Sequence, residues 1–397
     1  MDYRLTDQQK ALKKEFDDFF VEKMKGAPRD EDGNQITSYE SEEAYGFHRQ
    51  MMKDIAKTGW NVMAWPKEFG GQEAPVSEQV LYAESMAYHG SPGTDAAAMM
   101  FAPAVMLYGT EEQKNRILPP IAKSEVVYTQ GWSEPNAGSD LANLSTSAVK
   151  DGDHWVINGQ KIWTSGAHHA DYGFVLVRTD PNATRSRGLS VFNVNMKTPG
   201  IDIRPIHYMN GTHIYNEVFF TDVRIPENEL VGEVNEGWKQ TRITMNFERS
   251  GAGTYAGVKR TFEDLVALAK TTMRDGEPLI KKPSVRRRLA KLWMDIEVGR
   301  ALAYKIAYLQ EGGNLVFSPA AASESKVLGT ELRQRICHMG TEIFGLYGQI
   351  ERSKWSPMGG SMINGYQHSI GATICAGSNE IQRNIIAWVG LELPRFK

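Results

Sequence analysis

Hydrogen-bonding groups concentrate in the segment YTQGWSEPNAGSD, at residues 128–140. A strand-like start runs into a Pro-Asn-Ala-Gly turn that is rich in hydroxyls and free N–H groups. Such a turn can hold a phosphate or a planar, hydrogen-bonding ligand, because its N–H groups form a concave surface for an acceptor. A plain strand-to-loop turn explains the pattern equally well, so this segment alone does not define a ligand.

An aromatic ring stands beside hydroxyl groups further along, in NGQKIWTSGAHHADY. Trp163, Thr164 and Ser165 come at the end of an expected strand. A ring flanked by hydroxyls suits one face of a flavin. The alternative is a tryptophan of the hydrophobic core.

A turn of small residues opens a helix near the C-terminus, in ICAGSNEIQRNIIAWVG. Ser378 or Asn379 can cap this helix. Small residues at a helix N-terminus let a ligand approach the backbone N–H groups. Cys375, Ala376 and Gly377 offer no acid or base with an obvious role. The face expected to be buried consists of Ile381, Ile385, Ile386 and Val389.

The elements that must position these groups fall into three zones. Residues 1–125 are expected to be an N-terminal helical domain, with breaks at WPKEFGG and SPG. Residues 126–235 are expected to be a middle antiparallel β domain, in which Asp151-Gly152-Asp153 joins two strands. Residues 236–397 return to helical periodicity, for example at Leu289, Leu292, Trp293 and Ile296. This order predicts an α+β fold.

A glycine-rich stretch, GAGTYAG at residues 251–257, invites a dinucleotide-binding interpretation. Its spacing differs from G-x-G-x-x-G, and it continues a helical segment instead of following a strand. We therefore expect small residues at a close helix–helix contact. The segment EGGNLVFSP, at residues 311–319, is expected to be a loop between helices.

Composition narrows the class of protein. A chain of 397 residues with 41% hydrophobic and 23% charged residues is typical of a globular protein with more than one packed unit. A net charge of -3 provides no basic field for nucleic acid or an anionic membrane. Two cysteines argue against a disulfide framework, and no apolar run is long enough to span a membrane. The start MDYRLTDQQKALKKEF lacks an apolar signal core, so we expect a cytoplasmic, bacterial-type protein.

Taken together, these segments resemble the acyl-CoA dehydrogenase family over essentially the whole chain. The matching blocks are WPKEFGG, YGTEEQK, SEPNAGSDLANL, VINGQKIWTSGA, VFFTDVRIP and GSNEIQRNIIA. The resemblance implies an N-terminal helical domain, a middle β domain and a C-terminal four-helix bundle. It also implies bound FAD, oxidation of acyl-CoA thioesters to enoyl-CoA, a homotetramer, and electron transfer to an electron-transfer flavoprotein.

The resemblance assigns site residues position by position. Contacts with the flavin ring fall on Gln130, Trp132, Ser133, Trp163, Thr164 and Ser165. Gly138 and Ser139 match positions that contact flavin and the thioester arm of CoA. Arg274 matches an arginine that pairs with FAD phosphate across a subunit contact, and Ser378 and Asn379 match a turn that approaches FAD. In EIFGLYG, which includes Glu342 and Gly345, the family usually has a glutamine-containing segment that holds the neighbour's adenosine diphosphate.

The reaction needs a carboxylate, and the resemblance indicates where it lies. The backbone N–H of Ala376 matches the donor that binds the thioester carbonyl, but many relatives have their catalytic glutamate at this same position. A subgroup that includes isovaleryl-CoA dehydrogenase places the base on an earlier helix, at the position of Glu248 in MNFERSGAG. Arg249 then matches a position near the CoA pantetheine and phosphate. Without the resemblance, Glu248 would be interpreted as a solvated helix residue.

The acyl pocket is expected to accept a bulky group. Bacterial members that act on steroid side chains and alicyclic acids carry a similar FERSGA segment. SPGTDAAAMMFAP lies where the family lines this pocket, and Ala96, Ala97 and Ala98 would leave a wide cavity. Asp95 would then be either a helix cap or a second base for 1,4-dehydrogenation of a cyclic enoyl-CoA.

Two other classes remain open. One is a flavin monooxygenase or nitroalkane oxidase on the same fold, which would not need Glu248 as its base. The other is a subunit of a heteromeric dehydrogenase, and a heterotetramer would then replace the homotetramer.

Overall fold

The computed structural model describes residues 4–31, 34–93, 96–244, 251–311 and 319–395. The chain divides into two compact units, which are described one at a time. The first unit comprises Met1–Thr37, Ala74–Gly93 and Arg249–Lys397, and the second comprises Ser38–Glu73 and Thr94–Glu248. Some of the N-terminal helices belong to the first unit and the others belong to the second.

The second unit is built on a twisted sheet. Its strands are β1 (Tyr128–Gly131), β2 (Ser147–Asp151), β3 (His154–Lys161), β4 (Tyr172–Arg178), β5 (Leu189–Asn195), β6 (Ile201–Ile206), β7 (Tyr215–Pro226) and β8 (Leu230–Val231). They follow the order β6-β7-β3-β2-β4-β5-β8, and β1 pairs with β4. Gly152, at φ 63°, turns the chain between β2 and β3, so the expected hairpin is confirmed.

Most neighbouring strands of this sheet are antiparallel, as expected for the middle domain. The pairs of β1 and β2 with β4 are parallel. In the longest antiparallel ladder, β3 pairs with β7 from His154↔Pro226 to Lys161↔Val218. The register of this ladder shifts between Ile157 and Gly159, where a side chain on Gly159 would collide with Thr146.

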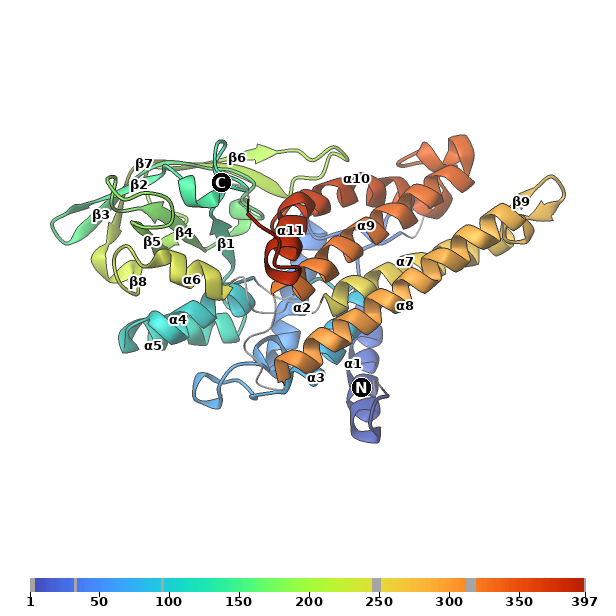
Figure 1. Ribbon diagram of the computed structural model, residues 1–397, viewed down its shortest axis with the longest axis horizontal. Coiled ribbons are helices and arrows are strands. Elements are labelled where there is room, and N and C mark those ends of the chain that lie inside the picture. Colours follow the sequence, from blue (N-terminus) through green and yellow to red (C-terminus); the bar gives the residue numbers. More distant parts are fainter. Residues whose placement is uncertain (1–3, 32–33, 94–95, 245–250, 312–318, 396–397) are drawn as a thin grey trace. The chain divides into compact units, whose positions relative to one another are not determined.

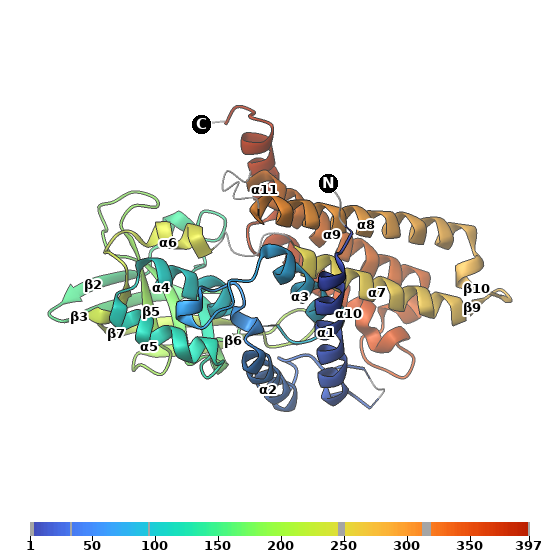
Figure 2. The ribbon, with the colours of Figure 1, turned by 90° about the horizontal axis from the view of Figure 1, so that it is seen from below.

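Helices cover one face of the sheet (Figures 1 and 2). The helices of this unit are α2 (Glu42–Thr58), α4 (Ala102–Tyr108), α5 (Glu111–Ala122) and α6 (Gly237–Thr244). Phe101 stacks on Phe174 of β4 with ring centroids 5.3 Å apart, and Leu118 and Ile121 of α5 belong to the same buried cluster. Another core, which contains Val175, Phe192 and Phe220, consists of sheet residues and their neighbours.

The first unit is a helical bundle with two N-terminal helices packed against it. These helices are α1 (Asp7–Lys23) and α3 (Val76–Tyr88). The bundle contains α7 (Ala252–Thr271), α8 (Pro283–Glu311), α9 (Pro319–Ile343) and α10 (Ser361–Ile374), followed by α11 (Asn379–Ile385). A short hairpin of β9 (Met273–Arg274) and β10 (Glu277–Pro278) joins α7 to α8. The α+β fold with a C-terminal four-helix bundle is thus confirmed.

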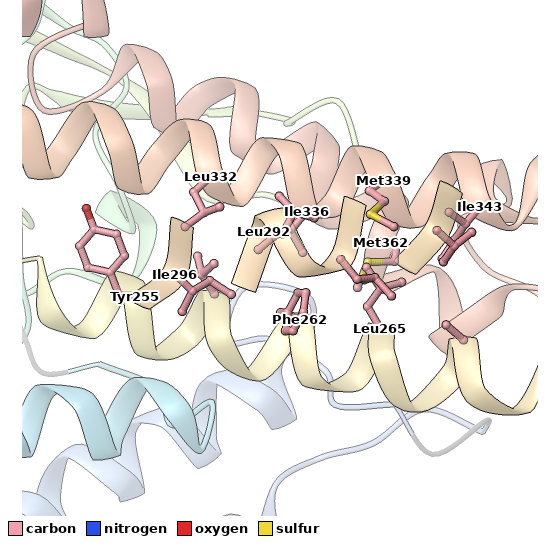
Figure 3. Close-up of a cluster of buried hydrophobic side chains, with 14 of the residues drawn as sticks. Tyr255, Phe262, Leu265, Leu292, Ile296, Leu332, Ile336, Met339, Ile343 and Met362 are labelled. Carbon is pink, nitrogen blue, oxygen red and sulfur yellow. The ribbon is translucent and has the colours of Figure 1, made fainter. Parts of the chain in front are cut away.

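A continuous apolar core runs along the bundle (Figure 3). Leu289, Leu292 and Ile296 of α8 are buried in it, as their spacing predicted. Trp293 was expected on the same face but is 38% exposed. Its ring lies beside Phe262 at the edge of the core, and the Lys259 ammonium lies over it.

The glycine-rich stretch at 251–257 serves helix packing, as predicted. Gly253 of α7 faces α3, and a Cβ there would lie 3.3 Å from the Ala83 carbonyl oxygen. Gly299 of α8 allows a closer approach between α8 and the Tyr255 side chain of α7. A Cβ on it would come within 2.0 Å of the Tyr255 ring, whose hydroxyl donates to the Ser325 carbonyl at 2.9 Å. The Tyr255 side chain therefore occupies the space that any side chain at 299 would need.

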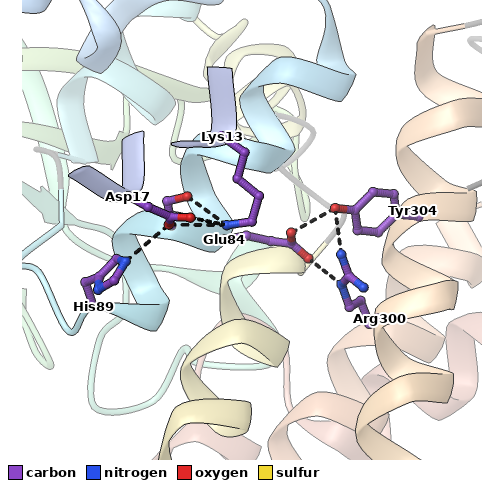
Figure 4. Close-up of polar contacts among 7 residues, drawn as sticks. Lys13, Asp17, Glu84, His89, Arg300 and Tyr304 are labelled. Carbon is purple, nitrogen blue, oxygen red and sulfur yellow. Dashed lines mark hydrogen bonds and ion pairs between the residues drawn. The ribbon is translucent and has the colours of Figure 1, made fainter. Parts of the chain in front are cut away.

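The polar contacts of α3 connect it to α1 and α8 (Figure 4). The buried Glu84 carboxylate accepts hydrogen bonds from Arg300 Nε at 3.0 Å and from the Tyr304 hydroxyl at 2.8 Å. Burial, reinforced by Glu84, raises the pKa of Tyr304 and keeps it a donor. On the other side, Lys13 donates to Ser85 at 3.1 Å. Each oxygen of the buried Glu84 carboxylate thus has a hydrogen-bond partner within this unit.

Gly299→Ala should destabilise the protein by about 1–3 kcal/mol, because the new methyl group overlaps the Tyr255 ring. The matched control is Gly257→Ala on α7, where a Cβ would lie 3.7 Å from its nearest neighbour. Urea unfolding followed by circular dichroism would compare the two. Equal stability of both variants would show that the Tyr255 contact does not limit the approach of α7 and α8.

Candidate active site

The second unit brings together the two sequence segments expected to bind flavin. The Thr129 hydroxyl donates to the Ser165 carbonyl at 2.8 Å. The Ile162 N–H donates to the Ser133 carbonyl at 2.8 Å. The end of β1, which carries Gln130, therefore lies directly beside the loop that follows β3.

Trp163 does not belong to the core. Its side chain is 54% exposed, and its backbone has φ 59°, a left-handed conformation that is costly for a bulky residue. Its ring meets the Tyr215 ring edge to face at 5.9 Å. Backbone strain that presents an aromatic ring to the surface is typical of ligand-binding sites. The core alternative for Trp163 is thereby excluded.

Two buried polar atoms of this region lack a protein partner. Among the described residues, none forms a hydrogen bond with Trp132 Nε1 or Thr164 Oγ1. The Trp132 ring packs edge to face on Phe174 at 5.8 Å, and Thr164 is buried. An unpaired buried polar atom is costly, so such atoms usually have a partner that the chain itself does not supply. An indole N–H donor and a hydroxyl beside an exposed ring fit the polar edge of a flavin.

Gly138 and Ser139 follow a tight turn, in which Glu134 and Ala137 exchange backbone hydrogen bonds of 3.1 and 3.0 Å. Both residues are exposed, and a Cβ on Gly138 would have no neighbour within 4 Å among the described residues. Nothing in the described part of the chain requires a glycine at 138 for steric reasons. Both residues stay predicted contacts of the flavin and the thioester arm.

The sequence analysis missed a buried ion pair at this site. The Lys161 ammonium donates to Glu134 at 2.8 Å and to the Trp132 carbonyl at 3.1 Å. Glu134 also accepts from the N–H groups of Ser145 and Thr146. Burial opposes its charge, but Lys161 and these donors outweigh burial and lower the pKa of Glu134 to about 2. The sequence signal that could have found this pair was an acidic residue, Glu134, in one of the segments expected to bind flavin and a basic residue, Lys161, in the other.

Lys161→Met should destabilise the protein by about 3–5 kcal/mol, because it leaves Glu134 buried without its counter-ion. The Glu134→Gln, Lys161→Met double variant should recover part of this loss, since it removes the unpaired charge. Urea unfolding at neutral pH would measure both. A single variant as stable as the wild type would show that the Glu134–Lys161 pair does not hold the two segments together.

The first unit places Arg274 beside Gly345. Arg274 Nη2 donates to the Ile343 carbonyl at 2.7 Å and lies 3.8 Å from the position of a Cβ on Gly345, whose φ is 60°. Glu342 instead pairs with Arg288, and this bond lowers the pKa of its carboxyl group. Arg274 and Gly345 therefore share one surface, whereas the Glu342 carboxylate is held by α8.

The C-terminal turn is held from several sides. Ser378 caps α11 by accepting from the Ile381 N–H at 3.4 Å, as predicted. Ala376 and Gly377 have φ values of 53° and 80°, and the Gln382 side chain donates to both of their carbonyls, at 3.2 and 3.4 Å. The expected buried face of the following helix is only partly covered in the single chain, and Val389 is exposed.

Lys326 is a further residue of this turn that the sequence analysis missed. Its ammonium donates to the Thr373 carbonyl at 3.2 Å and to Asn379 Oδ1 at 2.8 Å. The buried Asn379 amide also contacts Thr330 and Glu331 at 3.2 Å. The Asn379 side chain is therefore engaged within the chain, so a contact with FAD would use its backbone.

Several predicted residues lie outside the described part of the chain, namely Asp95, Glu248 and Arg249. Ala96 is described and exposed, whereas Ala97 and Ala98 are buried in the core. Both lie in the π-helical turn Ala97–Phe101, and the Trp65 indole donates to the Ala98 carbonyl at 2.9 Å. The expectation that all three alanines widen a cavity is thus wrong for Ala97 and Ala98.

The described residues offer neither a metal site nor a membrane-spanning helix. No group of three or more His, Cys, Asp or Glu side chains there is arranged to hold a metal ion. Among the same residues, no helix combines the length and the apolar character that crossing a membrane requires.

The chain belongs to the acyl-CoA dehydrogenase family. Models of the N-terminal, middle and C-terminal domains of that family match residues 6–125, 129–223 and 235–391. The enzyme is an acyl-CoA dehydrogenase, an oxidoreductase that acts on the CH–CH bond of acyl-CoA substrates with FAD as cofactor.

Its relatives include enzymes of mycobacteria. The chain is 35% identical over 401 residues to acyl-CoA dehydrogenase FadE26 of Mycobacterium tuberculosis, covering 98% of each chain. A chain of the ChsE4-ChsE5 complex from Mycobacterium tuberculosis superposes with a TM-score of 0.89 at 34% identity, with 100% of both chains covered. A chain of the Tcur3481-Tcur3483 steroid ACAD gives a TM-score of 0.87 at 33% identity, also with full coverage of both chains.

Proposed function

We propose that this enzyme dehydrogenates a bulky acyl-CoA, with a branched, alicyclic or steroid-derived acyl group, between Cα and Cβ, and that Glu248 is its base. The observation that carries the proposal is the C-terminal turn. Its left-handed backbone is fixed by Gln382 and Lys326, yet Ala376 stands where many relatives have their catalytic glutamate. A turn retained without its carboxylate supports a base elsewhere in the chain.

The backbone and side chains would divide the work as follows. The Ala376 N–H donates to the thioester carbonyl oxygen and stabilises the charge that develops there. The Glu248 carboxylate removes the α-proton, and Arg249 holds the CoA phosphate or pantetheine. FAD, when bound, accepts the hydride from Cβ. Ser139 and Gly138 hold the thioester arm, while Gln130, Trp132, Ser133 and the 163–165 loop hold the flavin ring.

The proposal of a bulky acyl group is supported by the name of one relative and by the small residue at position 376. The Tcur3481-Tcur3483 structure is titled a steroid ACAD. The small residue at 376 leaves space where a glutamate side chain would otherwise stand. Reduction of the flavin by a panel of acyl-CoAs under argon, including cyclic ones, would identify the substrate class. Slow reoxidation in air would separate a dehydrogenase from an oxidase or monooxygenase.

Glu248→Gln should retain FAD and bind acyl-CoA but reduce the flavin about 10²–10⁴ times more slowly, because the α-proton loses its acceptor. Ala376→Glu is the companion variant, which puts a carboxylate at the alternative position. Stopped-flow flavin reduction would compare the wild type, both single variants and the double variant. Activity restored in the double variant would support the relocated base, whereas a Glu248→Gln enzyme that reduces at the wild-type rate would remove Glu248 from this role.

The alternative role of Asp95 as a second base can be tested by comparing two substrates. If Asp95 is a second base for 1,4-dehydrogenation, Asp95→Asn should slow reduction by a cyclic enoyl-CoA more than by a straight-chain acyl-CoA. An equal effect on both substrates would leave Asp95 as a helix cap.

We further propose that FAD is shared between subunits of a tetramer and that electrons pass to an electron-transfer flavoprotein. Arg274 and Gly345 share a surface that suits the FAD phosphates of a neighbouring subunit. The titles of two similar structures each name two different proteins, which supports a heterotetramer as the alternative to a homotetramer.

Arg274→Ala should weaken FAD binding and assembly together, because one cation would serve both. Arg287→Ala, an exposed arginine at the start of α8, is the matched control and should change neither. Sedimentation velocity with detection of flavin absorbance would report both quantities. A monomer with fully bound FAD, in either the wild type or the variant, would contradict a shared site.

A further inference from the structure

A buried asparagine connects the predicted flavin-binding loop to two histidines. Asn216 of β7 is 0% exposed. The side-chain Nδ2 of Asn216 donates to the Thr164 carbonyl at 3.0 Å. The backbone carbonyl of Asn216 accepts from the Thr164 N–H, also at 3.0 Å. Both backbone polar groups of Thr164 are therefore held by this one residue, at the centre of the loop formed by Trp163, Thr164 and Ser165.

The remaining bonding capacity of the Asn216 amide is used by histidines. Nδ2 lies 3.1 Å from His168 Nδ1, and Oδ1 lies 2.8 Å from His213 Nε2. The two imidazole rings stack on each other with centroids 3.9 Å apart and planes inclined by 16°. We call the set Thr164, Asn216, His168 and His213 the Asn216 bridge.

The donors and acceptors of the Asn216 bridge can be assigned without ambiguity. The Thr164 carbonyl can only accept, so Nδ2 of Asn216 must face it, and Oδ1 must face His213. His213 then donates from Nε2. The second hydrogen of Nδ2 points to His168, so Nδ1 of His168 must accept and cannot carry a proton.

Protonation of His168 would therefore break the Asn216 bridge. An N–H on Nδ1 would face the N–H of Asn216, and both groups would be donors. Rotating the Asn216 amide by half a turn would place Oδ1 against the Thr164 carbonyl and Nδ2 against the His213 donor. No orientation of the amide satisfies all partners once His168 is an imidazolium.

The surroundings of His168 keep the ring neutral. Burial, together with the neighbouring rings of His169 and His213, lowers the pKa of His168 to about 4 and outweighs the hydrogen bond with Asn216, which acts in the opposite direction. The carboxylate of Glu42 acts on His169 in the opposite direction, but burial prevails and the pKa of His169 is also lowered. The titratable rings packed on this cluster are those of Tyr39, Tyr45, His169, His207 and His213.

We propose that Asn216 and His168 are positioning residues, which hold the Trp163–Ser165 loop in its flavin-binding conformation only while His168 is neutral. The proposal rests on the proposed contact between this loop and FAD. It predicts that the enzyme loses FAD as His168 takes up a proton in acid. The bridge thus couples cofactor retention to pH through a residue that does not itself contact the flavin.

The test compares FAD release by the wild type and His168→Gln as the pH falls. Glutamine offers an acceptor oxygen to Asn216 Nδ2 and does not titrate, so this variant should bind FAD at neutral pH within a few fold of the wild type and retain it at lower pH. The fluorescence of released flavin reports dissociation, and far-ultraviolet circular dichroism on the same samples reports unfolding. His154→Gln, at a partly exposed β3 histidine paired with Asp153, is the control and should behave as the wild type does.

A second variant tests the hydrogen-bond assignment. Asn216→Asp cannot donate to the Thr164 carbonyl, so FAD affinity at neutral pH should fall about tenfold or more. Identical release curves for the wild type and His168→Gln, whether or not release accompanies unfolding, would overturn the role of His168. Unchanged FAD affinity in Asn216→Asp would overturn the role of Asn216. Trp163→Ala tests separately the assumption that the Trp163–Ser165 loop contacts FAD. Unchanged FAD affinity in that variant would remove the loop from the flavin site.

Discussion

The buried pair of Glu134 and Lys161 is the interaction on which the candidate flavin site depends. Lys161 ends β3, and Glu134 follows β1. These strands are not neighbours in the sheet, so no ladder of backbone hydrogen bonds sets the distance between their ends. The ion pair, the bond from Lys161 to the Trp132 carbonyl and the single backbone bond from Ile162 to Ser133 set that distance instead. Because both charges are shielded from water, neither can leave the other without a large cost.

From this fixed point, the site is built by progressively less rigid contacts. The Ile162 N–H and the Thr129 hydroxyl attach the two segments on either side of the pair. The Asn216 amide then holds the loop at Thr164, and the Trp163 side chain lies at the surface beside the Tyr215 ring. Burial thus decreases from the Glu134–Lys161 pair toward the ring expected to meet the cofactor. Such an order holds a ligand precisely placed while its entry path stays open.

The sequence predicted the fold well because its signals were local. The Asp151-Gly152-Asp153 turn defined the β2–β3 hairpin, and the spacing of Leu289, Leu292 and Ile296 defined the buried face of α8. The prediction for Trp293 failed because a ring at the edge of a helical stripe can pack sideways, here beside a phenylalanine and under a lysine ammonium. The prediction for Ala97 and Ala98 failed because both pack into the buried cluster that contains Trp65 and Phe101, a tertiary contact that periodicity does not reveal. Glu134 and Lys161 are 27 residues apart, and Asn216 is 52 residues from Thr164, so no local pattern could pair them. The flavin segments were recognised through resemblance, and their roles stay predictions.

The shape of the C-terminal turn has a consequence for the evolution of such enzymes. Its left-handed backbone is held by the Gln382 amide and by Lys326 through Asn379 and the end of α10, and none of these contacts involves the side chain at 376. Residue 376 is therefore free to vary without reshaping the turn. A lineage can lose or regain an acidic group there by substitution at a single codon while its scaffold persists.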